Sequence, residues 1–177
     1  MLSGAFALAA AAPMGSAMAA PSIIRGAGDV RVISLTNPRT GESLHSVYWI
    51  EGSYIPEVLG QIDHIMRDWR LDLKRRIAPE LVDIIAATHR LLDTREPFTV
   101  FSGYRSPATN RMLRAKSRAV ARDSYHMQGM AADLHLESRS VRQIAAAGWS
   151  LQSGGVGRYS RSDFVHLDSG PLRDWGR

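Results

Sequence analysis

The chain has 177 residues, a formal net charge of +5 and no cysteine. This length fits a single domain that can bury a core without disulfides, and the lack of cysteine excludes a disulfide framework and a thiolate metal site. The positive charge favours an anionic partner, such as a bacterial cell-wall polymer, and no nucleic-acid-binding motif accompanies it. We therefore expect no nucleic acid among its partners.

The N-terminal residues 1–20 are small, apolar and uncharged, as in the hydrophobic core and cleavage region of a secretory signal. An A-x-A site at 17–19 precedes Ala20. The basic leader of such a signal is missing, since Arg25 is the first charged residue, so either the true start lies upstream or the signal is weak. The apolar run is too short and too interrupted for a stable membrane span. The sequence predicts export to the periplasm or cell envelope, and one domain over residues 21–177.

The first half of this domain has two strand-like and two helix-like segments. Residues 30–35 and 46–50 alternate in polarity as β-strands do, and a turn-rich Asn-Pro-Arg-Thr-Gly segment joins them. Apolar side chains recur at helical spacing over 56–69, which predicts a helix. A second helix is expected over 79–92, whose first residue is a proline that suits a first helical turn.

The second half alternates between short strands, helices and loops. Residues 98–101 have the pattern of a strand, and 109–115 that of a helix. The polar, basic stretch 116–123 is expected to be a loop beside a cleft. A short helix follows over 140–147, and the glycine-rich residues 154–157 are expected to form a turn that leads into a strand. Together these segments predict an α+β fold, with helices packed on a small, mostly antiparallel sheet.

The segment SYHMQGMAADLH and the later FVHLD segment carry the clearest chemical pattern. They place His126, Asp133 and His166 in the order H-x6-D…H. Two imidazoles and one carboxylate are the ligands that a catalytic zinc ion uses while it keeps a fourth position open for water. Gly129, midway between the first two residues, permits the tight turn that brings both side chains to one ion. The pattern therefore indicates a hydrolytic metal site.

Both segments also have the alternation of short strands, over 130–136 and 164–168. In the first strand this alternation puts Asp133 and His135 on one face, so His135 either lines the cleft or is a polar surface residue. Two neighbouring strands, with Asp133 on one and His166 on the other, would make a rigid platform for a metal ion.

Four segments carry a family resemblance, and they occur in this order at fitting distances: SGYRSPATN, SYHMQGMAAD, GGVGRY and SDFVHLDSGPLRDW. Over residues 30–175 the chain resembles the MepK-like branch of the zinc D-Ala-D-Ala peptidases, murein-cleaving enzymes that share a fold with lysostaphin and Hedgehog. The resemblance implies an α+β domain whose sheet carries one zinc ion (Zn²⁺). It also implies that peptidoglycan peptides are the substrates.

The resemblance makes His126, Asp133 and His166 the zinc ligands. It assigns Arg105, in the GYRS segment, to stabilise the oxyanion of hydrolysis or to anchor the substrate, which a fixed guanidinium suits. A turn arginine that pairs with a carboxylate is the structural alternative for Arg105. The neighbouring Ser106 is expected to cap the following helix.

The general base of the family is an acidic residue shortly before the last histidine, and Asp163 occupies this place before His166. Many relatives have glutamate here, and the shorter aspartate reaches less far. A regular strand would turn Asp163 away from His166, so we expect a turn or bulge at 162–163. Asp168 is either the alternative base or a partner that orients His166.

Two functional classes remain open at this level. The first is zinc-dependent hydrolysis of cross-link or stem peptides of peptidoglycan, most simply by an endopeptidase, with a carboxypeptidase as the variant. The second is a metal-bound but non-catalytic wall-binding module of the same fold. The complete ligand set, together with Arg105 and Asp163, favours the enzyme. Nothing in the sequence indicates the oligomeric state.

Overall fold

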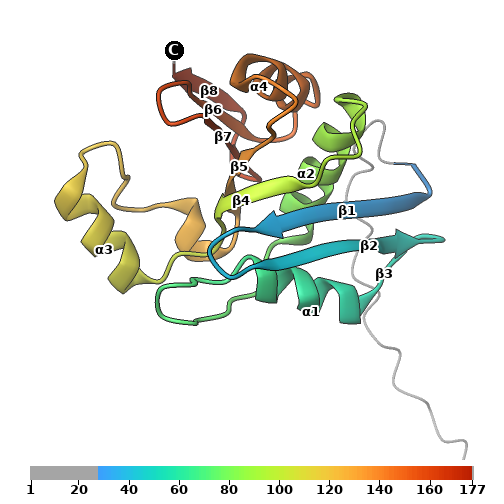
Figure 1. Ribbon diagram of the computed structural model, residues 1–177, viewed down its shortest axis with the longest axis horizontal. Helices are drawn as coiled ribbons and strands as arrows, with labels where there is room; N and C mark the ends of the chain where they lie inside the picture. The colour runs from blue at the N-terminus through green and yellow to red at the C-terminus, as the bar shows by residue number, and fades with distance from the viewer. Residues whose placement is uncertain (1–27, 177) are drawn as a thin grey trace, which may run out of the picture.

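The computed structural model describes residues 28–176, so the predicted leader at 1–20 lies outside the described part of the chain. Eight strands form one sheet in the order β3-β2-β1-β4-β5-β7-β6-β8 (Figure 1). The strands are β1 Val30–Asn37, β2 Glu42–Ile50, β3 Ser53–Tyr54, β4 Phe98–Ser102, β5 Ala131–His135, β6 Gly155–Tyr159, β7 Phe164–Asp168 and β8 Arg173–Gly176. The helices are α1 Pro56–Ile65, α2 Pro79–Leu91, α3 Pro107–Lys116 and α4 Val141–Ser150, with a single 3-10 turn, η1, at Tyr125–Gln128. The expected α+β class is confirmed.

The sheet is mixed and larger than expected. Five neighbouring pairs are antiparallel, whereas β1 with β4 and β6 with β8 are parallel. The sequence predicts a small sheet, but β1, β2 and β3 belong to the same hydrogen-bonded order as β5 and β7. The strands that carry the predicted metal ligands therefore lie in the interior of the sheet. Hydrogen bonds on both sides hold each of them in place.

The hydrophobic core and the predicted metal ligands lie on opposite faces of β7. Helices α2 and α4 contact each other and both contact β7. Leu167 points toward these helices, because a Cβ atom added to Gly148 of α4 would lie 2.8 Å from its side chain. Side chains alternate along a strand, so His166 points to the other face. Helix α3 stands apart from the other three helices (Figure 1).

Several predicted elements lie where the sequence pattern puts them. The expected strands at 30–35, 46–50 and 98–101 fall within β1, β2 and β4, and the expected helices at 79–92, 109–115 and 140–147 correspond to α2, α3 and α4. Helix α3 begins at Pro107, where Ser106 is the N-cap and its hydroxyl accepts a hydrogen bond from the Thr109 amide. Within residues 28–176, no helix combines the length and the apolar character needed to cross a membrane.

Helix α1 ends at Ile65 and not at Trp69 as predicted, although the apolar spacing continues. Tertiary hydrogen bonds take the carbonyl groups that a longer helix would use. The Asn37 side chain donates to the Ile65 carbonyl at 2.9 Å, and the Tyr104 amide donates to the Met66 carbonyl at 2.7 Å. The chain after α1 therefore supports the GYRS segment instead of continuing as a helix.

The prediction of a turn at 154–157 is wrong, because most of this segment forms strand β6. The glycines serve close packing. A Cβ atom on Gly157 would lie 2.6 Å from the ring of Trp175, which belongs to the neighbouring strand β8. This strand was not expected from the sequence either, and the absence of a side chain at Gly157 lets Trp175 lie across β6 toward the metal ligands.

Candidate metal centre and cleft

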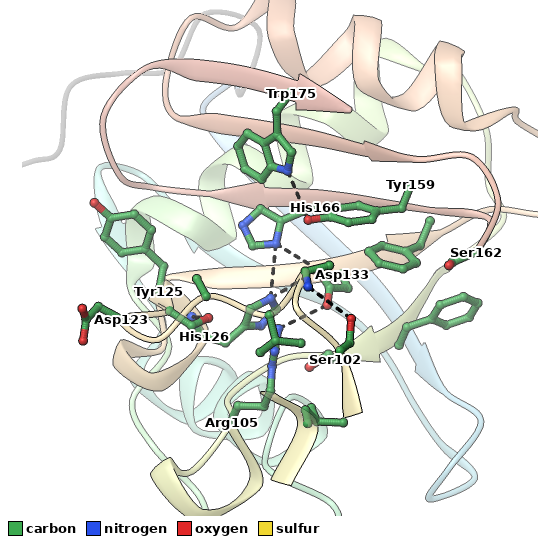
Figure 2. A pocket seen from close by; sticks show the side chains of 18 of the residues that line it. Ser102, Arg105, Asp123, Tyr125, His126, Asp133, Tyr159, Ser162, His166 and Trp175 are labelled. Carbon is green, nitrogen blue, oxygen red and sulfur yellow. Dashed lines mark hydrogen bonds and ion pairs between the residues drawn. The ribbon is translucent and has the colours of Figure 1, made fainter. Parts of the chain in front are cut away.

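Three elements bring His126, Asp133 and His166 together (Figure 2). Turn η1 carries His126, and the other two are register partners across the β5–β7 ladder. The Nε2 atom of His126 lies 3.2 Å from both Nδ1 of His166 and Oδ1 of Asp133, and Nδ1 of His166 lies 2.9 Å from that oxygen. In a tetrahedral zinc site with bonds of about 2.0–2.1 Å, ligand atoms lie about 3.3 Å apart. The three donor atoms therefore have nearly the spacing of three corners of such a site.

The outer nitrogen of each histidine has an acceptor that fixes its tautomer. Nδ1 of His126 donates to the Gly103 carbonyl at 2.7 Å, and Nε2 of His166 donates to Oδ2 of Asp168 at 2.9 Å. In the neutral rings, the inner nitrogens then carry lone pairs. These lone pairs face each other and the Asp133 carboxylate. Three acceptors gathered in this way create a site for a cation.

Burial and charge control the protonation of the three ligands. Burial lowers the pKa of His126, against the raising effect of Asp133. Burial also acts to lower the pKa of His166, but hydrogen bonds to Asp133 and Asp168 raise it above its ordinary value. Burial would raise the pKa of Asp133, yet the two histidines lower it well below its usual range. Asp133 is thus held ionised and His126 neutral, which are the forms that bind a metal ion.

Asp168 lies behind His166 and is fully buried. Besides His166, its carboxylate accepts hydrogen bonds from Arg173 at 2.7 and 3.1 Å and from the Gly170 amide at 2.9 Å. Although burial alone would raise the pKa of Asp168, the hydrogen bonds from His166 and Arg173 lower it below its ordinary value. This geometry matches the orienting role among the two alternatives, because the carboxylate is occupied on several sides.

Arg105 forms part of the cleft wall and is buried. Its Nη2 lies 3.5 Å from Oδ2 of Asp133, and its backbone amide donates to the His126 carbonyl at 3.1 Å. Burial lowers the pKa of its guanidinium, and the charge of Asp133 opposes this effect. The Nε atom of Arg105 has no hydrogen-bond partner within residues 28–176. Arg105 therefore holds its guanidinium at the cleft wall, next to the Asp133 carboxylate.

Asp163 is not brought into the cleft with the other predicted residues. The expected turn before β7 is present, and it puts Asp163 in the left-handed conformation with φ of 54°. The carboxylate is 69% exposed and lies 3.5 Å from Nδ1 of His135, which also donates to the Asp163 carbonyl at 2.8 Å. The cleft lining includes its neighbours Ser162 and Phe164 but not Asp163 itself. His135, placed in the cleft or on the surface by the sequence, instead holds this turn.

A cleft of about 690 Å³ opens beside His126, Asp133 and His166, which form part of its lining. Aromatic side chains that the sequence pattern does not identify form part of its wall. Trp175 lies with its ring 5.2 Å from that of His166 and donates to the Tyr159 hydroxyl at 3.1 Å (Figure 2). Tyr159 stacks on Phe164 at 4.5 Å. These residues come from separate strands, so no local spacing could predict their proximity. Part of the predicted loop at 116–123 also lines the cleft, as expected.

The turn at Gly129 is required by sterics as well as by conformation. Its φ is 73°, and a Cβ atom there would lie 2.2 Å from the Arg76 carbonyl oxygen. The carbonyl of Gly129 accepts a hydrogen bond from the Ala78 amide at 2.9 Å. The predicted role of Gly129 in bringing His126 and Asp133 together is confirmed, because no side chain fits between this turn and the chain that precedes α2.

The chain was compared with known proteins, and it matches the family model described as peptidoglycan L,D-endopeptidase MepK over residues 25–175. It is 44% identical over 145 residues to the peptidoglycan L,D-endopeptidase MepK of Escherichia coli K12, which covers 82% of this chain and 80% of that protein. It is 35% identical over 146 residues to a probable peptidoglycan L,D-endopeptidase MepK of Haemophilus influenzae, with coverage of 82% and 78%.

Among solved structures, the L-Ala D-Glu endopeptidase ChiX of Serratia marcescens is similar, with 26% identity over 52% of this chain and 80% of that chain. Its TM-score of 0.39 is too low to support an argument. The family model and the curated relatives, in contrast, span most of the chain. The chain therefore belongs to the family of MepK peptidoglycan L,D-endopeptidases.

Proposed function

We propose that the protein is a zinc-dependent endopeptidase that hydrolyses L,D-linked peptides of bacterial peptidoglycan. The observation that carries this proposal is the close grouping of His126 Nε2, Asp133 Oδ1 and His166 Nδ1, whose separations of 2.9–3.2 Å are near those of the ligand atoms of a tetrahedral zinc site. Such a donor set favours a divalent cation with nitrogen and oxygen ligands. The substrate class and the type of bond follow from the names of the relatives.

His126, Asp133 and His166 hold the zinc ion in this proposal. Three protein ligands leave one position of a tetrahedral site open. When bound, zinc would act as a Lewis acid that polarises the scissile carbonyl and lowers the pKa of a bound water to about 7. The protein contributes orientation, since the hydrogen bonds to Gly103 and Asp168 hold the two imidazole rings in place.

Arg105 stabilises the negative charge that develops on the carbonyl oxygen of the substrate. A buried guanidinium beside the ligands is preorganised for this charge, because its position is fixed before the substrate arrives. The Arg105 guanidinium belongs to the cleft wall and supplies the N–H donors that this role requires. The ion pair with Asp133 keeps the guanidinium in the cleft wall.

Asp163 is the proposed general base. Asp168 is fully buried and engaged by His166 and Arg173, so its carboxylate has no access to the cleft. The Asp163 carboxylate is exposed, and the residues on either side of it line the cleft. Asp123 competes for this role, because it is the acidic residue other than Asp133 that lines the cleft among residues 28–176.

The protein acts where peptidoglycan is, in the periplasm or cell envelope, and the leader at 1–20 is proposed to direct it there. Mass spectrometry of peptidoglycan fragments after incubation with the purified protein tests the function. Parallel samples contain added zinc or a chelator. We expect zinc-dependent loss of cross-linked dimers, and the fragment masses identify the bond. Loss of a terminal residue with intact dimers would indicate a carboxypeptidase. Binding without any cleavage, by folded and metal-loaded protein, would support the non-catalytic wall-binding module.

A further inference from the structure

The cleft carries an excess of positive charge, and Arg70 contributes the unbalanced part. Among residues 28–176, the cationic side chains of the lining are those of Arg70, Arg105 and Arg173. Arg105 pairs with Asp133, and Arg173 pairs with the buried Asp168. The other acidic residue of the lining, Asp123, pairs with Arg122. The side chain of Arg70 makes no ion pair with a carboxylate in the described part of the chain, and the residue is exposed.

Arg70 is nevertheless held in place. Its guanidinium carbon lies 4.2 Å from the centre of the Trp69 ring, in a cation–π contact. Its backbone amide donates to Oδ1 of Asp68 at 3.2 Å, while Oδ2 of the same carboxylate accepts from the Ser106 amide at 2.9 Å. Asp68 is buried and thus joins the segment of Arg70 to the segment of Arg105. One buried side chain thus links the backbone at Arg70 to the backbone next to Arg105.

Both arginines line the same cleft. Like charges in one cleft are unfavourable until an anion enters between them or beside them, so a negatively charged ligand relieves this arrangement.

We propose that Arg70 is a specificity-determining residue, which pairs with a free carboxylate of the substrate peptide on the Arg105 side of the metal centre. This inference rests on the proposed function, because it assumes that a peptide occupies the cleft. Arg105 is buried and reaches the reacting carbonyl, whereas Arg70 is exposed and reaches a group farther along the peptide. A guanidinium binds a carboxylate through two parallel hydrogen bonds, so the contact depends on the orientation of the carboxylate as well as on its charge.

The carboxylate has two possible sources, a side chain of the peptide or its C-terminus. The test uses three synthetic substrate peptides: one with all carboxylates free, one with the side-chain carboxylate amidated and one with the C-terminal carboxylate amidated. Zinc-loaded wild type is compared with Arg70→Gln. Arg118→Gln is the matched control, since Arg118 is also exposed and lies in the loop beside the cleft without lining it.

We expect amidation of one of the two carboxylates to lower kcat/KM of the wild type and of Arg118→Gln about tenfold, the effect of losing one charge-assisted pair. Arg70→Gln should show the same loss with the free peptide and no further loss with the amidated one. The peptide that shows this effect identifies the source of the carboxylate. Equal effects of amidation in Arg70→Gln and in the wild type would overturn the proposal.

A calorimetric measurement of peptide binding keeps this inference separate from the proposed function. The same peptides and variants are titrated under conditions without turnover, with the zinc removed by a chelator. A tenfold weaker affinity for the amidated peptide in the wild type, absent in Arg70→Gln, supports the carboxylate contact even if the peptide is never cleaved. If the affinity of the wild type does not depend on amidation, the inference about Arg70 is overturned, even if the zinc-loaded protein cleaves the peptides.

Discussion

The molecule contains two buried clusters built around an aspartate, and they differ in how their polar groups are matched. Around Asp83, Arg31 and Tyr48 both donate to Oδ1 at 2.7 Å, and Tyr54 donates to Oδ2 at 2.7 Å. Around Asp133, the inner nitrogens of His126 and His166 face the carboxylate while their outer nitrogens donate to Gly103 and Asp168, so each neutral ring has its lone pair on the inner side. The first cluster has enough donors for its acceptors, whereas the second has a surplus of acceptors that only a cation can satisfy.

This difference distinguishes a structural site from a functional one. Asp83 is fully buried and is not part of the cleft lining, and it joins α2 to strands β1, β2 and β3. Burial and the charge of Asp83 both raise the pKa of Tyr48, so this hydroxyl keeps its proton and remains a donor. Asp133 opens onto a cleft and belongs to a His-Asp-His group that could hold a metal ion. Burial of a carboxylate alone therefore does not indicate function, but the chemistry of the groups that face it does.

The strongest test of the comparison is removal of a metal ligand. His126→Ala or His166→Ala should abolish zinc retention and reduce peptide cleavage by at least about a thousandfold, because the Lewis acid is lost. Metal content is measured by plasma mass spectrometry and cleavage by chromatography. A chelator should have the same effect on wild-type protein, and added zinc should restore only the wild type. Full activity in metal-free protein would refute the metal-dependent mechanism.

Replacement of the proposed general base should have the second largest effect on activity. Asp163→Asn should retain zinc and lower kcat by about 10²–10⁴-fold, the usual contribution of a general acid–base group. Asp123→Asn is the matched variant, because Asp123 is the competing acidic side chain and is also exposed. We expect a small effect for Asp123→Asn. If the two results were exchanged, Asp123 would be the base and Asp163 only part of the turn held by His135.

A substitution in the cluster around Asp83 should lower stability and leave metal content and activity unchanged. Asp83→Ala leaves the Arg31 charge buried without a partner, and we expect a loss of about 3–5 kcal/mol in the free energy of unfolding. Urea denaturation measures this loss. Zinc content and kcat/KM of the folded fraction should stay near the wild-type values, since the cluster does not touch the cleft. A selective loss of zinc without a loss of stability would contradict the division between the two clusters.

A third, half-exposed carboxylate should give the smallest effect. Hydrogen bonds from Arg67 lead the causes that lower the pKa of Glu42 to about 2. Its contribution to stability is therefore fully present above the ordinary value of 4.5 and is lost as the pH falls toward 2. We expect Glu42→Gln to remove about 1 kcal/mol or less of the free energy of unfolding at neutral pH. Unfolding curves of the two proteins should converge on acidification.

The grouping of the three candidate metal ligands was accessible to prediction because their chemistry is local and distinctive. His126, Asp133 and His166 are the residue types of a catalytic zinc site, and Gly129 marks the turn that joins the first two. Apolar periodicity also located α2, since its buried stripe repeats within one element. Zinc binding by these three residues and the catalytic roles of Asp163 and Arg105 stay predictions until the variants are measured.

Long-range contacts decided what the pattern of residues left open. Helix α1 stops at Ile65 because Asn37 and Tyr104, distant in sequence, bind its last carbonyl groups. Arg70 enters the cleft because Asp68 ties it to Ser106, and no spacing in the chain announces this link. Residue types and their periodicity thus specify a ligand set and the elements that carry it. The sheet order and hydrogen bonds between distant segments decide which carboxylates are engaged, which cations stay free and which of them face the substrate.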